Sequence, residues 1–376
     1  MKPASRAQQV VAGTSANNRS ISTRPRPPSS SGTMITSAVY LLSIWAGMVS
    51  AVYIFQPDNH TTWKNTRIPT IIDPSEDQNS GSYWTSAFLT TTTGRQFLLI
   101  QHQFAAYCKS SVLDLGSLEY WKHVDHCEPN NDTKTVTSDS LSLRFPNFSV
   151  VTTTPDKVSG LELYAKSRDY SFTLNVECRT SKMLMNGGNG VIAWGADRAH
   201  SNTTHWSIPA ARTSGLLTLG KSKPLALDPA KSFAYYDHQN IFGGAPNNFT
   251  WFEAHFPNPN IRVSIWAYDW ADSSDEWRYA TVRVGDETMM VLPYTWQVDW
   301  DDTWVSGTSN RTYPQRWTLT FENGDYLTFK SVKKDQEMLE GTWTGFATIE
   351  SRFMGQTSGF GIVDQVHVSR ARANLS

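Results

Sequence analysis

The chain has 376 residues, with 33 Lys and Arg against 34 Asp and Glu and a net charge of -1. This balance argues against a nucleic-acid partner, which would require a basic face. The 15 Trp, 14 Tyr and 17 Phe are many for this length, and aromatic side chains favour pleated sheets and apolar ligand sites.

Residues 1–33 are rich in Ser, Pro, Asn and Gln and carry five basic residues but no acid. A segment of this composition buries almost no apolar surface, so we expect a disordered basic tail.

Residues 34–55, MITSAVYLLSIWAGMVSAVYIF, contain no charged side chain and are long enough to cross a bilayer as a helix. Positive charge before them predicts that the amino side stays in the cytosol. Val49-Ser50-Ala51 also offers the small residues that signal peptidase requires. The segment therefore fits a signal anchor or a cleaved signal peptide. The remaining alternative is a buried helix of a soluble protein.

Seven N-glycosylation sequons follow the hydrophobic segment, and an eighth, at Asn18, precedes it. Together with the segment they predict a glycoprotein of the secretory lumen or the extracellular space, membrane-anchored or secreted. The seven predicted glycosylation sites are Asn59, Asn131, Asn147, Asn202, Asn248, Asn310 and Asn374.

The three cysteines are Cys108, Cys127 and Cys178. An oxidising compartment predicts one disulfide and one free thiol. Cys127 lies in a polar loop that needs tethering, so we expect it to pair with Cys178 or Cys108.

Beyond residue 70 no stretch keeps a helical period, and short alternating runs bounded by Gly, Asn, Asp and Pro recur about every ten residues. The expected fold class is therefore all-β. So many antiparallel strands usually form two closed or sandwiched units. The breaker cluster at 243–247 divides them into an N-terminal domain over 70–246 and a C-terminal domain over 247–376. Asn323-Gly324 predicts a tight hairpin turn with positive φ at both positions, and Asn186–Gly190 predicts a second hairpin.

Standard catalytic motifs are missing: the chain has no nucleophile elbow, zinc helix or P-loop. The residues His123, Asp125, His126 and Cys127 fit no closed metal site well, and the acidic runs at 269–276 and 299–302 are explained by solvated loops, with calcium as the alternative. We therefore expect no metal and no cofactor.

Two neighbouring segments carry the most promising chemistry, 235–240 (YYDHQN) and 251–256 (WFEAHF). In a strand, Trp251, Glu253 and His255 share one face, and the alternating apolar residues share the other. The mixed face either meets solvent or lines an interior where its polar groups do acid–base work.

These segments resemble the lipocalin-like superfamily of hydroxyneurosporene synthase, kievitone hydratase and the fungal Diels–Alderases. The resemblance spans about residues 80–367. It is carried by Tyr83-Trp84-Thr85-Ser86, Asp237-His238-Gln239 before Trp251-Phe252, Tyr313-Pro-x-x-Trp317-x-Leu319, Asp335-Gln336-Glu337 and Gly359–Asp364. Asp364 stands where the family pattern has Glu, and Asn240 stands where it has Trp.

The resemblance implies two consecutive lipocalin-like β-barrels with a ligand cavity at or near their junction. Among the members, the hydrophobic segment and the sequons fit the secretory hetero-Diels–Alderases of tropolone–sesquiterpenoid biosynthesis. Those enzymes join a polyketide-derived o-quinone methide to a humulene-type terpene. The expected partners are thus small lipophilic substrates, and also a membrane if residues 34–55 are retained.

A cycloaddition needs positioning between aromatic walls and one hydrogen-bond donor. The predicted catalytic residues are Asp237, His238, Glu253, His255 and Tyr236, and the predicted substrate-binding residues are Tyr83, Trp84, Trp206, Trp251 and Trp266. Two alternatives remain. One is a hydratase or dehydratase of a prenylated substrate, for which Asp237, Glu253 and His255 would be essential. The other is a carrier of lipophilic ligands without catalysis.

Overall fold

The structure is a computed structural model that describes residues 52–59, 81–128, 130, 132–137, 140–193, 202–243, 248–269, 276–286 and 288–366. The predicted tail and most of the hydrophobic segment lie outside these residues. Val52–Phe55, the last four residues of that segment, are extended and not helical. Among the described residues, no helix is long and apolar enough to cross a membrane.

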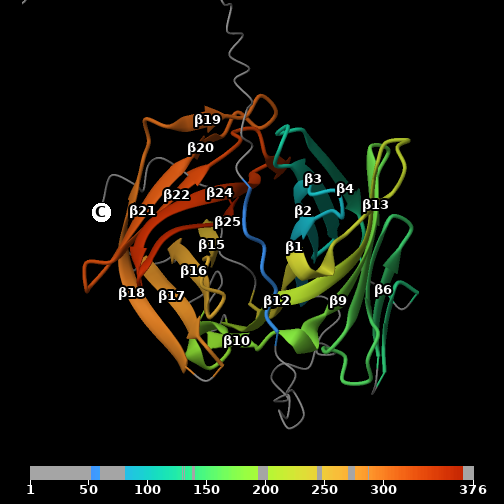
Figure 1. The fold of residues 1–376 in the computed structure, drawn as a ribbon, viewed down its shortest axis with the longest axis horizontal. Helices are drawn as coiled ribbons and strands as arrows, with labels where there is room; N and C mark the ends of the chain where they lie inside the picture. Colours follow the sequence, from blue (N-terminus) through green and yellow to red (C-terminus); the bar gives the residue numbers. More distant parts are fainter. Residues whose placement is uncertain are drawn as a thin grey trace, which may run out of the picture. The chain divides into compact units, whose positions relative to one another are not determined.

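The first half of the described chain forms one antiparallel sheet, here called the N-terminal sheet (Figure 1). It has 14 strands in the order β4-β3-β2-β1-β14-β12-β9-β8-β7-β6-β5, with β10, β11 and β13 paired to β12. This unit is a half-barrel. Its strands are β1 (Gly81–Thr90), β2 (Gln96–Phe104), β3 (Tyr107–Asp114), β4 (Tyr120–His126), β5 (Lys134–Val136), β6 (Leu141–Phe145), β7 (Phe148–Thr152), β8 (Leu161–Lys166), β9 (Tyr170–Glu177), β10 (Leu184–Met185), β11 (Val191–Ile192), β12 (Asn202–Leu219), β13 (Leu225–Ala226) and β14 (Phe233–Phe242). Three short 3₁₀ turns join them, η2 (Cys178–Thr180), η3 (Asn186–Gly188) and η4 (Pro229–Lys231).

The second half forms a nine-stranded sheet in the order β22-β21-β18-β17-β16-β15-β25-β24-β23. Pairing of β22 with β24 closes it into an eight-stranded barrel, here called the C-terminal barrel. Its strands are β15 (Phe249–His255), β16 (Ile261–Asp269), β17 (Glu276–Val284), β18 (Thr288–Val298), β21 (Arg316–Phe321), β22 (Tyr326–Ser331), β23 (Glu337–Leu339), β24 (Thr342–Phe353) and β25 (Gln356–Val366), and a separate pair is formed by β19 (Thr303–Val305) and β20 (Thr312–Pro314). The predicted all-β fold with two consecutive lipocalin-like units is confirmed.

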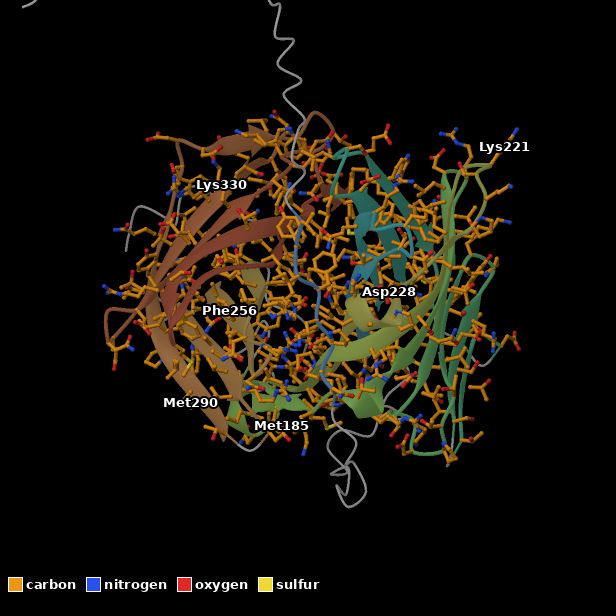
Figure 2. The ribbon with its side chains drawn as sticks, viewed as in Figure 1. Met185, Lys221, Asp228, Phe256, Met290 and Lys330 are labelled. Carbon is orange, nitrogen blue, oxygen red and sulfur yellow. A yellow bond between two sulfur atoms is a disulfide. The ribbon has the colours of Figure 1, made fainter. Side chains whose placement is uncertain are left out.

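Three clusters of buried apolar side chains hold these sheets together, and Figure 2 shows side chains filling the space between the strands. One cluster lies inside the N-terminal sheet and another, which includes Phe256, lies inside the C-terminal barrel. The remaining cluster mixes residues of both units, among them Trp84, Phe88, Trp251 and Trp266, and so forms the junction between them. Burial of these large aromatic surfaces is the main force that joins the two units.

Of the two expected hairpin turns, only one joins strands that pair with each other. Asn323-Gly324 does join β21 to β22, but only Gly324 has a positive φ, of 81°, as in a longer hairpin loop with a glycine bulge. The second prediction was wrong. The turn at Asn186–Gly190 separates β10 from β11, but both of these strands pair with β12 and not with each other.

Cys108 and Cys127 form a disulfide with a Cα–Cα distance of 5.7 Å. This is one of the two expected pairings, and it ties β3 to the residue after β4. Cys178 is free and buried, and burial raises the pKa of its thiol, so that the unreactive protonated form is favoured.

Candidate active site at the junction

Strand alternation decides which side chains reach the junction. On β1, Trp84 and Phe88 belong to the junction cluster, whereas Tyr83 and Ala87 belong to the cluster inside the N-terminal sheet. Successive residues of a strand point to opposite faces of its sheet. On β15 the same rule turns Trp251, Glu253 and His255 toward the junction. It turns Phe252 and Ala254, together with Phe256 directly after the strand, into the barrel.

Strand register then lines these side chains up in rows that cross the sheets. In the N-terminal sheet Trp84 is paired with His102 on one side and with Asp237 on the other. In the C-terminal barrel Trp251 is paired with Asp364 and with Trp266. The two rows meet where the Trp84 and Trp251 rings make an edge contact, with centroids 5.6 Å apart. We call these facing rows the carboxyl layer, since each contributes one Asp.

A pocket of about 60 Å³ opens in the carboxyl layer. It contains both carboxyl groups and all three Trp side chains of the layer, and its outer rim adds polar and apolar groups of the next row. The lining residues are Ser82, Trp84, His102, Phe104, Asp237, Gln239, Ile241, Phe249, Trp251, Trp266 and Asp364. We refer to it as the junction pocket.

Asp237 is held through one of its oxygens. His205 Nε2 lies 2.6 Å and Ser207 Oγ 2.5 Å from Asp237 Oδ1. Both hydrogen bonds reach the same carboxyl oxygen, and neither reaches Oδ2. The amide nitrogen of Gln239 lies 3.3 Å from His205 Nδ1, which assigns the ring proton to Nε2 and makes that nitrogen the donor to Asp237.

Asp364 has a different environment. Its Oδ1 accepts a 2.5 Å hydrogen bond from Thr344 Oγ1, again leaving Oδ2 out of the bond. Burial raises the pKa of this carboxyl, although the Lys109 ammonium and Thr344 oppose the rise. Burial lowers the pKa of Lys109 in turn, against the attraction of Asp364. Burial and then Lys109 also hold the pKa of His102 well below its usual range. Burial thus shifts the Asp364 carboxyl toward its protonated form and the His102 imidazole toward its neutral form.

Directly behind the carboxyl layer lies a glutamate layer. Ser86 Oγ donates to Glu253 Oε2 across the junction, and Tyr235 donates to Ser207 Oγ over 2.7 Å. Burial raises the pKa of Glu253 well above its usual range; nearby Asp237 adds to the rise, whereas Ser86 and Arg262 oppose it. The backbone of β25 approaches β15 closely here, because a Cβ at Gly361 would lie 1.7 Å from the Glu253 carbonyl oxygen.

A histidine layer follows, built on His255. Its Nε2 bonds Glu253 Oε1, and Arg262 Nη1 lies 3.4 Å from its Nδ1. Burial and then Arg262 lower the pKa of His255 well below its usual range. The rings of Phe233, Phe88 and Phe360 surround the imidazole, with centroid distances of 4.7, 5.0 and 5.6 Å.

The predicted site residues divide by face. Asp237, Trp84, Trp251 and Trp266 line the junction pocket. Glu253 and His255 lie in the two layers behind it. The other four, Tyr83, Trp206, Tyr236 and His238, occupy the opposite face, toward the interior of the N-terminal sheet. They do not reach this pocket. Tyr83 is next to Trp84 on β1, and Tyr236 and His238 flank Asp237 on β14, so all three point to the other face. Trp206 of β12 is paired with His238 and shares its face.

Residues of the clusters that were weighed as metal ligands have structural roles. Cys127 is oxidised, and His123 Nε2 pairs with Asp125 over 3.0 Å. Asp299 Oδ1 accepts the backbone N–H of Asp301 in a turn. A larger pocket of about 1100 Å³ borders the C-terminal barrel and includes Asn248 and Phe249, but its carboxylates, Glu276 and Asp299, are exposed or half-buried.

Asp364, His102 and Lys109 were missed by the sequence analysis. Asp364 could have been found, because it occupies the position where the family pattern has Glu. His102 and Lys109 carry no comparable signal, since His102 reaches the pocket, and Lys109 lies beside His102, only through the pairing of β1, β2 and β3.

Two lipocalin-like β units with an aromatic pocket bearing two carboxyl groups at their junction define the class of protein. The AttH-like family profile matches residues 83–364, and the chain belongs to this family. The predicted membership of the lipocalin-like superfamily is thereby confirmed.

Two relatives match over nearly their whole length. The chain is 29% identical to kievitone hydratase of Fusarium solani subsp. phaseoli over 351 residues, 90% of this chain and 97% of the relative. It is also 29% identical to dehydratase asqC of Emericella nidulans over 338 residues, 85% of this chain and 95% of the relative.

Solved structures agree with the fold. The crystal structure of kievitone hydratase from Nectria haematococca has a TM-score of 0.75 at 27% identity, covering 84% of this chain and 99% of that chain. CghA with Sch210972 has a TM-score of 0.53 at 10% identity, covering 84% of this chain and 97% of that chain, which is a likeness of fold alone.

Proposed function

We propose that the protein is a cofactor-independent enzyme that adds water to, or removes water from, a small lipophilic substrate whose reacting group enters the junction pocket. One observation carries the proposal: Asp237 and Asp364 both line this pocket, and among the described residues each accepts side-chain hydrogen bonds through Oδ1 only. A pair of carboxyl groups in different environments is the arrangement that acid–base catalysis requires.

In the hydration direction, Asp364 gives its proton to one carbon of an alkene. Water loses a proton to Asp237 and bonds to the adjacent carbon, and solvent returns the proton from Asp237 to Asp364. Dehydration is the same sequence reversed. The acid role is given to Asp364, because burial raises its pKa. The base role is given to Asp237, the other carboxyl group of the pocket, whose Oδ1 accepts hydrogen bonds from His205 and Ser207.

The relatives support this reaction class, because their names are those of a hydratase and a dehydratase. The lining of the pocket, rather than its volume of about 60 Å³, supports the substrate class. Trp84, Trp251 and Trp266 provide aromatic walls for a planar, apolar substrate.

The test uses the glycosylated protein and a panel of prenylated phenols with their hydrated counterparts. Asp237→Asn and Asp364→Asn should each lower kcat about 100-fold or more, the usual contribution of a general acid or base. The matched control is Glu322→Gln, which changes an exposed carboxylate after β21. Wild-type turnover in both Asp variants would reject the mechanism.

The predicted hetero-Diels–Alder reaction is the second candidate, and the three Trp walls favour it. Loss of water from a benzylic alcohol of a phenol in the same pocket would leave an o-quinone methide between them. A humulene-type terpene could then add without a further catalytic group, by positioning alone. Incubating a quinone-methide precursor with humulene tests this, and a yield and stereochemistry equal to those in buffer would reject it.

We also propose that the protein matures in the secretory pathway. The Cys108–Cys127 disulfide supports an oxidising compartment, and Asn59, Asn202 and Asn310 are exposed as glycan acceptors must be. Digestion with an N-glycosidase should increase the electrophoretic mobility of the native protein, and unchanged mobility would contradict the proposal.

A further inference from the structure

Residues 52–59, here called the strap, run as an extended segment between the two β units and are drawn in blue in Figure 1. Val52 and Ile54 are 81% and 63% exposed, whereas Phe55 and Asp58 are only 3% and 4% exposed. The alternation shows that one side of the strap is built into the junction. Tyr53 N–H donates to Gln96 Oε1 over 2.8 Å, and Gln96 Nε2 donates back to the Tyr53 carbonyl over 2.7 Å.

Asp58 joins both units through its carboxylate. Arg262 of β16 donates to Oδ1 through Nη2 at 2.8 Å and Nε at 3.2 Å, and Arg283 of β17 donates to Oδ2 at 2.5 Å. From the N-terminal sheet, Ser181 Oγ donates to Oδ2 at 2.7 Å, and Asp58 N–H donates to the Ala210 carbonyl at 2.9 Å. The Arg262 and Arg283 guanidinium groups, which are buried, therefore have their counter-charge on the strap.

Phe55 adds an apolar contact at the same place. Its ring lies 5.1, 5.7 and 6.4 Å from those of Phe360, Phe88 and Phe233. These are the three rings that enclose the imidazole of His255. The strap thus covers the histidine layer from one end.

Arg262 transmits the position of Asp58 to His255. A guanidinium only donates hydrogen bonds, so the Arg262 Nη1 contact at 3.4 Å makes His255 Nδ1 an acceptor without a proton. The ring proton is then on Nε2, which donates to Glu253 Oε1. The same guanidinium donates from Nε and Nη2 to Asp58. These two hydrogen bonds hold Nη1 of Arg262 against the His255 imidazole.

We propose that Asp58 is a positioning residue that, through Arg262, fixes the neutral Nε2-protonated tautomer of His255 and so the orientation of Glu253 behind the junction pocket. The effect of Asp58 on turnover rests on the proposed acid–base function. Its effect on the tautomer of His255 does not depend on that function. The strap is then a working part of the site and not a linker to the preceding segment.

The charged and titratable groups around His255 come from five elements. They are Glu253 on its own strand, Arg262 of β16, Arg283 of β17, Tyr235 and Asp237 of β14, and Asp58 of the strap. With Asp58 neutralised, the two Arg cations would lose their partner and attract the Glu253 anion instead. Glu253 should then release its proton at lower pH.

The test is ¹⁵N NMR of the histidine rings in the full chain, with the signal of His255 assigned among nine His by His255→Gln. Wild type and the control Gln56→Ala, an exposed strap side chain, should show only the Nε2-protonated ring of His255 between pH 6 and 8. Asp58→Asn should show a second, Nδ1-protonated population. Arg262→Lys, which keeps the cation but loses the guanidinium fork, should show the same and decides the question if Asp58→Asn does not fold. An unchanged tautomer in the folded variants would overturn the proposal.

Turnover gives the second readout. Asp58→Asn should lower kcat about tenfold or more and leave KM within about twofold. Unchanged kcat together with the expected tautomer change would overturn the positioning role. Absence of water-adding activity in wild type would instead reject the proposed function, while the NMR result would still decide the role of the strap.

Discussion

Asp237 and Asp364 line one pocket, yet their neighbours give them different chemistry. His205 and Ser207 donate to Asp237, whereas Asp364 has one hydroxyl donor and an ammonium further away. Both carboxyl groups are buried, but only Asp237 accepts two hydrogen bonds on one oxygen. At the residue scale, the proposed roles of Asp364 as acid and Asp237 as base rest on this difference.

The raised pKa of Asp364 predicts a pH-dependent stability. The folded carboxyl keeps its proton to a higher pH than the unfolded one, which ionises at about pH 4. Over that interval the folded state binds more protons, so the free energy of unfolding falls as pH rises. Asp364→Asn removes this pH-dependent contribution to the free energy of unfolding. The stability difference between variant and wild type, from urea unfolding, should shift in favour of the variant between pH 4 and pH 8; a constant difference would contradict the account.

Glu253 is fully buried behind the pocket, and we predict that it acts through neighbouring groups. Glu253→Gln keeps the shape and a hydrogen-bond acceptor for His255, so the protein should fold and kcat should fall about tenfold. Glu253→Ala leaves Ser86 and His255 without their partner and should also lower stability by about 2 kcal/mol. Thermal unfolding together with steady-state kinetics separates the two effects. Equal losses of kcat and of stability in both variants would count against this role.

At the scale of elements, β15 is the strand that organises the junction. Its alternate residues Trp251, Glu253 and His255 supply one group to each of the three layers, and β25 and β16 flank it on either side. The sequence predicted that these residues share a face. It could not decide between solvent and an interior, because the partner face comes from β1 and β14 of the other unit.

The strap should contribute to stability as an element. Phe55→Ala removes a nearly fully buried ring that touches three other rings, and such a cavity costs about 3 kcal/mol or more. Ile54→Ser, at a 63% exposed position of the strap, is the matched control and should cost less than about 0.5 kcal/mol. Chemical unfolding of both variants gives the comparison, and equal midpoints would show that the strap is not docked in solution.

At the scale of the whole molecule, the site exists only because two β units meet. The sequence predicted the all-β class, and the family resemblance predicted a cavity near the junction. The residue pairs that build it could not be predicted, since Trp84 and Trp251, or Asp58 and Arg262, are joined only by the docking of the units. Tyr83, Trp206, Tyr236 and His238 were chosen for their chemistry, but sequence alone does not fix which face of the sheet meets the partner unit.

Glycans should affect turnover unequally. Asn248 lines the large pocket beside Phe249, and Phe249 also lines the junction pocket, so a glycan at Asn248 would stand near both. Asn374 lies outside the described residues. We predict that Asn248→Gln lowers activity more than Asn374→Gln, measured as kcat/KM on equal amounts of folded protein. Equal effects would contradict this.

Isotope incorporation tests the central claim most directly, namely that the two carboxyl groups across the junction pocket move the proton and the oxygen of water. Wild-type protein is incubated with a prenylated phenol in ¹⁸O-labelled D₂O, and the product is examined by mass spectrometry and NMR. We predict one ¹⁸O and one deuterium on adjacent carbons, with both labels lost in Asp237→Asn and Asp364→Asn but retained in Glu322→Gln. A product without solvent oxygen, or labelling that persists in both Asp variants, would contradict the account.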